Sequence, residues 1–202
     1  MIERGTLIIM AKTPRIGAGK TRLAADIGKL EAWRINRALQ ARTLREARDP
    51  RWRTLMCVTP DADLDLALPR VWPRRVARIA QGEGDLGARM GRALAPHRNV
   101  AVIGTDCPAM TRAHIASAFG ALKRAPFAIG LAPDGGFWIL AARSGAAAAR
   151  AMQGVRWSSK HAAADVTRNL GLGQAVWLPM LGDIDTIEDW RAYRRARRAS
   201  SG

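Results

Sequence analysis

Short apolar segments alternate along the chain with longer amphipathic segments. The first, residues 6–11, is an unbroken apolar run of the kind that forms a central parallel strand covered on both faces. Similar runs follow at residues 54–59, 76–80, 100–104, 127–132, 137–142 and 175–178. Helical patterns cover residues 30–47, 85–94, 112–123, 159–169 and 186–199. This alternation predicts an α/β fold built largely from βαβ units.

One pair of predicted strands is joined too tightly for a parallel crossover. Residues 127–132 and 137–142 are separated only by Pro133-Asp134-Gly135-Gly136. Proline, aspartate and glycine are typical turn residues, and so short a connection fits a β-hairpin. The expected sheet is therefore mixed, with mostly parallel strands.

Length and composition favour one compact unit. The chain has 202 residues, 48% of them apolar, and neither a repeat nor a flexible linker divides it, so we expect a single domain over residues 1–202. The apolar run at residues 7–11 is far shorter than the roughly 20 residues that span a bilayer. Cys57 and Cys107 are too few for a disulfide scaffold. We expect a soluble cytoplasmic protein, whose oligomeric state the sequence leaves open.

The net charge is strongly positive. There are 33 Lys and Arg residues against 17 Asp and Glu residues, which gives +16 at pH 7. Such a charge raises nucleic acid, an anionic surface or a polyphosphate ligand as a partner. Arginines are spread along the chain and aromatic residues make up only 5%, which is not the pattern of an RNA-binding surface. The basic tail at residues 191–198 is interpreted as a solvated helix face, and no nucleic-acid partner is expected.

A cation-rich turn follows the first predicted strand. In open α/β sheets, ligands bind beyond the carboxyl ends of the strands. The cations and glycines of this turn are Lys12, Arg15, Gly17, Gly19, Lys20 and Arg22. Its ending resembles a Walker A loop, but Pro14 stands where that motif needs glycine. We therefore predict a phosphate-binding loop of another kind, the alternative being an ordinary solvated turn.

The scarce acidic residues lie at strand ends and turns. Asp106 directly follows the apolar run at residues 100–104, where its carboxylate suits Mg²⁺, a cation that prefers hard oxygen ligands. Asp134 lies in the hairpin turn, and a catalytic role and plain turn chemistry are both open. Near the end of the chain, Asp183 and Asp185 precede a helix and could complete a divalent-metal site or order a loop.

Three further segments carry weaker or structural signals. Thr186 and Asp189 have the spacing of a capping box, with Asp in place of Glu. Residues 81–87 hold three glycines and fit either a loop that lies against a ligand or a plain connection. Trp157-Ser158-Ser159 precedes a predicted helix, which fits aromatic packing plus an N-cap, and it could also contact an acceptor.

The motifs together resemble a bacterial family. In order, they are Ala11-Lys12-Thr13-Pro14, Gly17, Lys20-Thr21-Arg22-Leu23, Gly84-Asp85-Leu86-Gly87, Ile103-Gly104-Thr105-Asp106-Cys107-Pro108, Pro133-Asp134-Gly135-Gly136-Phe137, Trp157-Ser158-Ser159 and Asp183-Ile184-Asp185-Thr186. Across nearly the whole chain they resemble the glycosyltransferases or transferases associated with radical-SAM and selenodomain genes. That family lies within the nucleotide-diphospho-sugar transferase (glycosyltransferase A-type) superfamily. More distantly, the chain is similar to 2-phospholactate and molybdenum-cofactor guanylyltransferases.

The resemblance implies a Rossmann-like sheet with helices on both faces, a nucleotide donor and Mg²⁺ or Mn²⁺. The implied nucleotide- and phosphate-binding residues are Ala11, Lys12, Gly17, Lys20, Arg22, Gly84, Asp85 and Thr105. The implied metal ligands are Asp106 with Asp183 or Asp185, and we expect Lys20, Asp106 and Asp134 to be the catalytic residues.

Two reactions fit this machinery. A nucleoside triphosphate donor implies nucleotidyl transfer, and a nucleotide-sugar donor implies glycosyl transfer, in either case to a small-molecule acceptor. A phosphate acceptor needs no base, whereas a hydroxyl acceptor would use a carboxylate, for which Asp134 is the candidate. The rival hypothesis is a non-catalytic basic module that binds RNA or anionic surfaces on the same fold.

Overall fold

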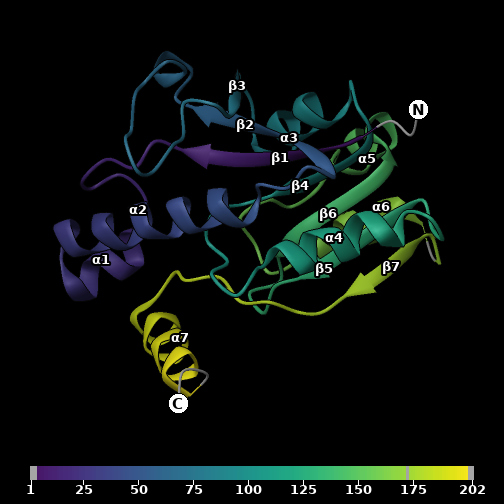
Figure 1. Cartoon of the computed structure of the whole chain (residues 1–202). Helices are drawn as coiled ribbons and strands as arrows, with labels where there is room; N and C mark the ends of the chain where they lie inside the picture. The colour runs from purple at the N-terminus through teal and green to yellow at the C-terminus, as the bar shows by residue number, and fades with distance from the viewer. Residues whose placement is uncertain (1–3, 172, 200–202) are drawn as a thin grey trace.

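A computed structural model of the chain describes residues 4–171 and 173–199. Within these residues the chain forms one seven-stranded sheet of order β3-β2-β1-β4-β6-β5-β7 (Figure 1). The strands are β1 (Gly5–Lys12), β2 (Trp52–Thr59), β3 (Ala77–Ala80), β4 (Arg98–Ile103), β5 (Phe127–Leu131), β6 (Phe137–Ser144) and β7 (Ala175–Leu178). All strands expected from the sequence are present, with ends that differ by one or two residues at most.

The sheet is mixed, as the sequence predicts. β6 runs antiparallel to β4 and β5, and the remaining neighbours are parallel. The hairpin between β5 and β6 is confirmed, since Ile129 pairs with Leu140 and Gly130 with Ile139 across it. The physical reason is the short connection, which lets the chain reverse but not cross over.

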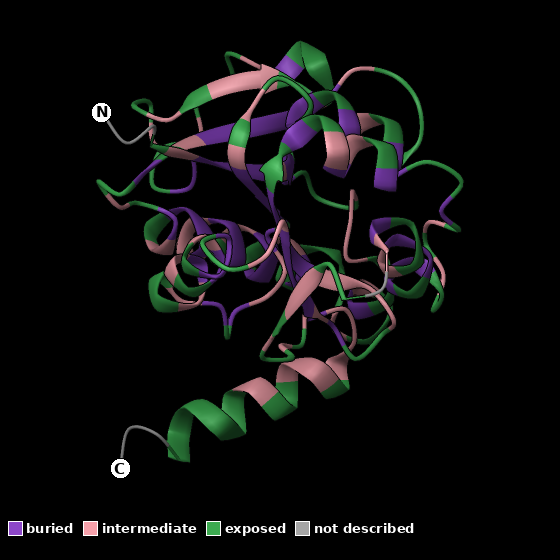
Figure 2. Cartoon of the chain, turned by 90° about the vertical axis from the view of Figure 1, so that its right-hand side faces the viewer, coloured by how far each residue is buried: buried purple, intermediate pink, exposed green. Residues whose placement is uncertain are grey.

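Helices pack in layers on both faces of the sheet. They are α1 (Thr21–Ile27), α2 (Lys29–Glu46), α3 (Leu86–Leu94), α4 (Arg112–Ala121), α5 (Gly145–Ala151), α6 (Ala162–Leu170) and α7 (Ile187–Ala199). One core cluster joins the sheet to α3, α5 and α6, and another joins it to α4 and the end of α2. β1 contributes to both, because Leu7 and Ile9 face one cluster and Ile8 faces the other, all fully buried (Figure 2). The fold class is therefore confirmed.

Two short helices were not among those expected. α1 begins in the last two residues of the segment interpreted as a phosphate loop, and α5 is a run of mostly alanines without an amphipathic pattern. α5 packs between α3 and α6, where small residues allow a close approach. A Cβ on Gly145, its first residue, would collide with the carbonyl of Leu94.

A third cluster attaches the end of the chain to α1 and α2. Leu23, Ile35, Leu39 and Ile184 form its buried centre, and Trp190 of α7 packs against it. The rest of α7 lies apart from the sheet and is largely exposed (Figures 1 and 2). Among the described residues, no helix combines the length and apolar character that crossing a membrane requires.

Strand direction brings several loops to one edge of the sheet. β1 and β4 are parallel neighbours, so the loops after Lys12 and after Ile103 begin at the same edge. β6 is antiparallel to β4, with Ile139 opposite Ile103, so the hairpin turn that precedes β6 opens onto that edge as well. Segments that the sequence marks as functional thereby meet in space.

Candidate active site

The loop between β1 and α1 is anchored in its first half. Arg15 donates to both carboxylate oxygens of Asp63 at 2.7 and 2.9 Å, and Trp33 Nε1 donates to the Pro14 carbonyl at 2.8 Å. The pair formed by Arg15 and Asp63 holds the pKa of that carboxyl below its usual range. Arg15 thus has a structural contact, whereas the sequence suggested only a possible anion ligand.

The second half of the loop turns sharply to present Lys20. Gly17, Gly19 and Lys20 have φ values of 78°, 88° and 51°. Glycine adopts this left-handed region freely, whereas a residue with a Cβ atom adopts it at a cost. Lys20 lies directly before α1 and has this strained left-handed conformation. Such strain persists where other contacts of the residue compensate for it.

The Lys20 ammonium lies between two carboxylates. Its Nζ is 3.1 Å from Asp106 Oδ2 and 2.9 Å from Asp185 Oδ1, and it donates to the Ile184 carbonyl at 2.5 Å. The Lys20 side chain is only 5% exposed. Burial alone lowers the pKa of Lys20, but the negative charges of Asp106 and Asp185 outweigh it and hold that pKa above its usual range. Lys20 is therefore a protonated cation shared by two carboxylates.

A backbone contact brings these two carboxylates together. Asp106 follows β4, and its carbonyl accepts from the amide of Ile184 at 3.0 Å. The Ile184 side chain is 1% exposed, which fixes Asp185 beside it. The expected capping pair is present, because Asp189 accepts from the Thr186 amide at 2.8 Å and the Thr186 hydroxyl accepts from the Asp189 amide at 3.3 Å. The segment is thus held at both ends.

Asp183 stands beside the same cluster and is harder to ionise. Burial raises the pKa of Asp183 to about 6, with further contributions from the negative charges of Asp185 and Asp134. Asp106, Asp134, Asp183 and Asp185 thus concentrate negative charge at one edge of the sheet. Lys20 is the cation that contacts two of them.

This arrangement fits a hard divalent cation in part. In the described ranges, no group of three or more His, Cys, Asp and Glu side chains forms a ready metal site. Mg²⁺, however, is commonly held by one or two carboxylates, with water and substrate phosphates completing its shell. Asp106 and Asp185 supply two such carboxylates, and one oxygen of each lies close to the Lys20 ammonium. Asp185, rather than Asp183, shares Lys20 with Asp106.

The surroundings of Asp134 are compatible with both roles that the sequence left open, turn formation and catalysis. Its Oδ1 accepts from the Gly136 amide at 2.9 Å, which is the hydrogen bond of an ordered turn. The same residue also lines a cavity beside the cluster. Gly135 joins this turn to the neighbouring loop, because its carbonyl accepts from the Ala163 amide at 2.9 Å and a Cβ on it would collide with the Lys160 carbonyl.

The cavity has a volume of about 450 Å³ and lies over the ends of β1, β4 and β6. Its polar lining includes Arg22, Asp134, Ser158, Ser159, Lys160 and Asp185. Its apolar lining includes Met10, Met90, Val102, Phe137, Trp138 and Trp157. Trp157 forms an edge contact with Phe137 at a centroid distance of 6.4 Å and packs over Gly87 of α3, where a Cβ would collide with the indole. The carboxylate cluster therefore borders a rigid, partly aromatic pocket.

The remaining residues expected to bind nucleotide have mainly backbone roles. The carbonyls of Ala11 and Lys12 accept from Gln81 and Gln40 at 3.3 and 2.9 Å. Asp85 caps α3 by accepting from the Ala88 amide at 2.8 Å. None of these residues lines the cavity.

The last two residues of this set, Gly84 and Thr105, lie in different loops. Gly84 has a φ of 100° and its carbonyl accepts from Arg89 at 2.8 Å. The buried hydroxyl of Thr105 lies 3.4 Å from Asp106 Oδ1. Thr105 thus borders the carboxylate cluster, whereas Gly84 belongs to the loop before α3.

Sequence reasoning missed several parts of the site. The carbonyl of Ile184 carries no sequence signal, because any residue has a carbonyl. Lys160 and Met10 gave no signal as lining residues either, since no local pattern shows that β1 and the loop before α6 meet across a cavity. Trp157 was suspected only from its position before a helix.

Solved structures share this fold. A Desulfovibrio desulfuricans G20 protein, itself only proposed to be a nucleotide-diphospho-sugar transferase, superposes with a TM-score of 0.90 at 25% identity, over 98% of this chain and 89% of its own. For 4-diphosphocytidyl-2C-methyl-D-erythritol synthase of Anaerococcus prevotii DSM 20548, the TM-score is 0.62 at 13% identity, over 96% of both chains. Glucosyl-3-phosphoglycerate synthase of Mycobacterium tuberculosis, solved with Mn²⁺ and uridine diphosphate, gives 0.54 at 11%, over 94% of this chain and 75% of its own. These likenesses confirm the expected fold.

The sequence itself also has a family match. No curated protein sequence matches the chain. Residues 43–159, more than half of the chain and including Asp106 and Asp134, match the family described as uncharacterized proteins conserved in bacteria, DUF2064. The chain belongs to this family.

Proposed function

We propose that the protein is a divalent-metal-dependent transferase that takes a nucleoside triphosphate or a nucleotide sugar as donor and acts on a small-molecule acceptor. The observation that carries the proposal is the meeting of Lys20, Asp106 and Asp185 at the carboxyl ends of β1 and β4, beside a cavity of about 450 Å³. In open α/β sheets this edge is where ligands bind. The likeness to a named nucleotide-diphospho-sugar transferase supports the same reaction class.

Asp106 and Asp185 would hold the metal ion, Mg²⁺ or Mn²⁺. When bound, such an ion neutralises charge that develops on the phosphates of the donor. The negative charge of Asp185 contributes to the raised pKa of Asp183, so Asp183 lies near the cluster. In this proposal Asp183 is a neighbour of the metal-binding pair and not one of its two ligands.

The loop between β1 and α1 would bind the phosphates. Lys12 and Arg22 have no hydrogen-bond or ion-pair partner for their side chains among the described residues, so their charges are available to an anion. Gly17 permits close approach of the backbone, and Lys20 lies at the cluster itself. Preorganised cations of this kind act by positioning the donor and stabilising charge in the transition state. Ala11, Gly84, Asp85 and Thr105 would line the rest of the donor site.

The cavity would receive the acceptor. Trp157 and Phe137 offer flat apolar surface, and Lys160, Ser158 and Ser159 offer polar groups to fix an orientation. Asp134 faces this space, where it would take a proton from an attacking hydroxyl in glycosyl transfer. Nucleotidyl transfer to a phosphate would leave Asp134 without that task.

Thermal-shift measurements test the proposal. Nucleoside triphosphates and nucleotide sugars, each with and without Mg²⁺, should raise the melting temperature in a metal-dependent way, since a ligand that binds only the folded state stabilises it. Asp106→Asn should abolish the metal-dependent part of the shift. Asp65→Asn, an exposed carboxylate outside the site, is the matched control and should keep it.

Two results would contradict the proposal. One is the absence of a shift with every nucleotide in the wild-type protein. The other is a shift of equal size with and without Mg²⁺ that survives Asp106→Asn. To separate the two reactions, Asp134→Asn should slow glycosyl transfer and leave nucleotidyl transfer to a phosphate acceptor unchanged.

A further inference from the structure

Lys20 occupies the position between Asp106 and Asp185 at which the proposed function calls for a divalent cation. Its ammonium lies 3.1 and 2.9 Å from one oxygen of each carboxylate, and it also donates to the Ile184 carbonyl. An ammonium group has three N–H donors, so these contacts account for all of them. The carboxylate pair therefore already holds a fully coordinated cation.

A second cation cannot join the same two oxygens without opposing the first. Two positive charges a few ångströms apart repel each other strongly where water is excluded, and the Lys20 side chain is 5% exposed. The side chains of Asp106 and Asp185 are 43% and 40% exposed, so an incoming ion can reach them from solvent. The two carboxylates are therefore accessible to an ion from solvent, but the positive charge of Lys20 already neutralises part of their negative charge.

The chain before Lys20 can move without breaking buried contacts. Before Lys20, Arg15 is the last residue of the loop whose side chain makes a hydrogen bond among the described residues. The amide of Ala18 donates to the Arg15 carbonyl at 3.1 Å, within the loop itself, and Ile16 is 57% exposed. Gly17 and Gly19 follow with positive φ, and nothing comes nearer than 3.7 Å to the place of a Cβ on either one. Rotation at two glycines could withdraw the Lys20 side chain while β1 and Arg15 stay in place.

We infer that Lys20 is a built-in counter-cation of Asp106 and Asp185, and that it gives up these carboxylates when a divalent cation binds. Lys20 and the metal then compete for one site, and a metal-loaded site leaves the Lys20 ammonium free for the phosphates of the donor. The inference rests on the proposed function, because it takes Asp106 and Asp185 as the metal-binding pair.

Mn²⁺ binding to the nucleotide-free protein tests the competition without any assay of activity. The electron paramagnetic resonance signal of free Mn²⁺ measures its affinity for the wild type, Lys20→Met and Lys29→Met. Lys20→Met should bind Mn²⁺ about ten-fold more tightly or better, because the competing charge is gone. Lys29 lies on α2 near the same loop without an ion pair in the described part of the chain. Lys29→Met should stay within about two-fold of wild type, since solvent and salt screen an exposed charge.

A second measurement uses the wild-type protein alone. Reductive methylation read by mass spectrometry reports how accessible each lysine amine is. Lys20 should be protected without metal and become reactive at Mg²⁺ concentrations that fill the site, whereas Lys29 should react equally in both conditions. Lys20→Gly, which suits the left-handed backbone, repeats the affinity measurement with a variant free of that strain.

The results separate the inference from the function on which it rests. Unchanged or weaker Mn²⁺ binding in Lys20→Met and Lys20→Gly, or continued protection of Lys20 in the metal-filled wild type, would overturn the role of Lys20 alone. Tight Mn²⁺ binding that survives Lys20→Met combined with Asp106→Asn would instead overturn the metal site and the proposed function with it.

Discussion

At the scale of single residues, a few backbone positions hold the site together. Gly135 is the clearest, because its φ of 87° and its contact with the Lys160 backbone both exclude a side chain. It links the turn that carries Asp134 to the loop that carries Trp157. A residue without chemistry of its own thus sets the distance between two walls of the cavity.

Gly135→Ala should therefore destabilise the protein more than an alanine at another left-handed glycine. Gly154 provides the matched control, since its φ is 65° and nothing lies within 4 Å of the place of its Cβ. Gly154→Ala should cost about 1 kcal/mol of unfolding free energy from backbone strain alone. Gly135→Ala should cost roughly 1–3 kcal/mol more, because the collision adds to the strain. Urea unfolding measures both, and equal losses would show that the contact with Lys160 is not a constraint.

A second residue-scale prediction concerns acid stability. Asp165 accepts from the amide, Nε and Nη2 of Arg156 at 3.1, 2.8 and 2.7 Å. These hydrogen bonds hold the pKa of Asp165 well below its usual range in the folded state. The stabilisation is therefore fully present above the unfolded-state pKa, about 4, and is lost as pH falls below it.

Asp165→Asn tests this, because asparagine does not titrate. The unfolding free energy of the wild type should fall between about pH 5 and pH 3, and that of Asp165→Asn should fall less steeply over the same range. Asp65→Asn, at an exposed aspartate without an ion pair among the described residues, is the control for removing a carboxylate without removing this contact. Identical slopes for all three proteins would contradict a stabilising contact between Asp165 and Arg156.

At the scale of elements, the site depends on a segment without regular secondary structure. Residues 179–186 connect β7 to α7, and the segment is held by backbone contacts of Leu181 and Ile184 with the ends of other strands. Ile184 is buried among α1 and α2, so packing there positions Asp185. The second carboxylate of the proposed metal pair is thus placed by an apolar neighbour.

Ile184→Ala should weaken both folding and metal binding. Truncating a buried isoleucine costs about 2–5 kcal/mol of unfolding free energy, and the loss of this anchor should lower Mn²⁺ affinity as well. Leu30→Ala, at a side chain that is 48% exposed, is the control and should change stability by about 0.5 kcal/mol at most. A stable Ile184→Ala protein with unaltered Mn²⁺ affinity would show that Asp185 is positioned by other contacts.

Elements with a strong pattern could be predicted from the sequence, and short ones could not. β1, β4 and β7 were expected at nearly their observed bounds, because short unbroken apolar runs bounded by glycine, proline or polar residues are typical of buried strands. α5 was missed because a run of alanines carries no amphipathic signal, although alanine favours helices intrinsically. It forms a helix where it can pack closely against α3 and α6.

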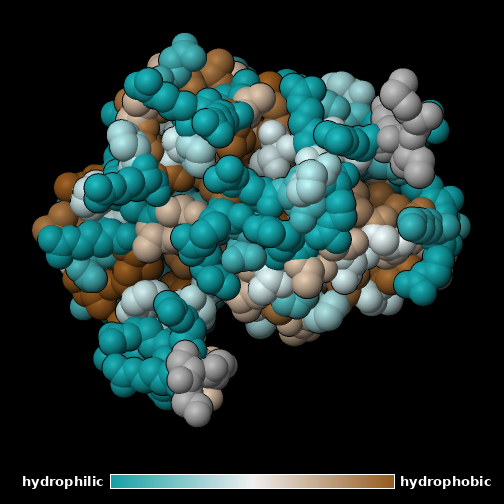
Figure 3. Space-filling view, in the orientation of Figure 1, coloured by the Kyte–Doolittle hydropathy of each residue, from teal (hydrophilic) through white to brown (hydrophobic). Residues whose placement is uncertain are grey.

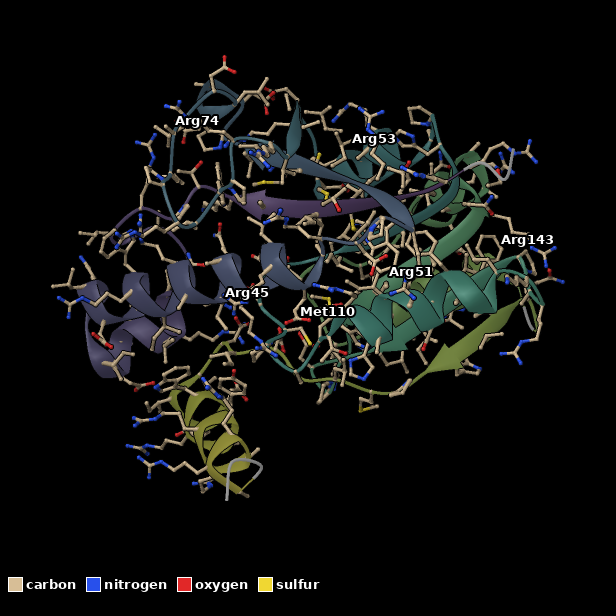
Figure 4. The ribbon with its side chains drawn as sticks, in the orientation of Figure 1. Arg45, Arg51, Arg53, Arg74, Met110 and Arg143 are labelled. Carbon is tan, nitrogen blue, oxygen red and sulfur yellow. The ribbon has the colours of Figure 1, made fainter. Side chains whose placement is uncertain are left out.

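At the scale of the whole molecule, the charge of +16 is spread over the surface. Figure 4 labels arginines on separate elements, among them Arg45 on α2, Arg53 on β2 and Arg143 on β6. Hydrophilic side chains cover most of the face shown in Figure 3, including α7. A dispersed charge of this kind supports weak, salt-sensitive attraction to anions rather than one defined nucleic-acid surface.

Binding to single-stranded RNA should therefore be weak and should disappear as salt rises to physiological concentration. Replacing Arg191, Arg194 and Arg195 of α7 by Gln should reduce the residual low-salt binding and leave metal-dependent stabilisation by nucleotides unchanged. Fluorescence anisotropy with labelled oligouridylate measures the RNA binding, and thermal shift measures the metal-dependent stabilisation by nucleotides. Tight RNA binding at about 0.15 M salt would favour the rival hypothesis of a basic binding module.

By itself the sequence determined the order of the seven strands and of five of the seven helices in the described residues, the mixed sheet, and the segments in which we expected a site. Periodicity, turn residues and the positions of the few carboxylates are local signals, and local signals can be read from the sequence without a tertiary structure. Only the tertiary structure decided that Lys20 lies between Asp106 and Asp185, that Asp185 rather than Asp183 shares it, and that Trp157 and Lys160 border a common cavity with Asp134. These relations join residues far apart in the chain. They depend on the packing of buried side chains such as Ile184, and no local pattern records that packing.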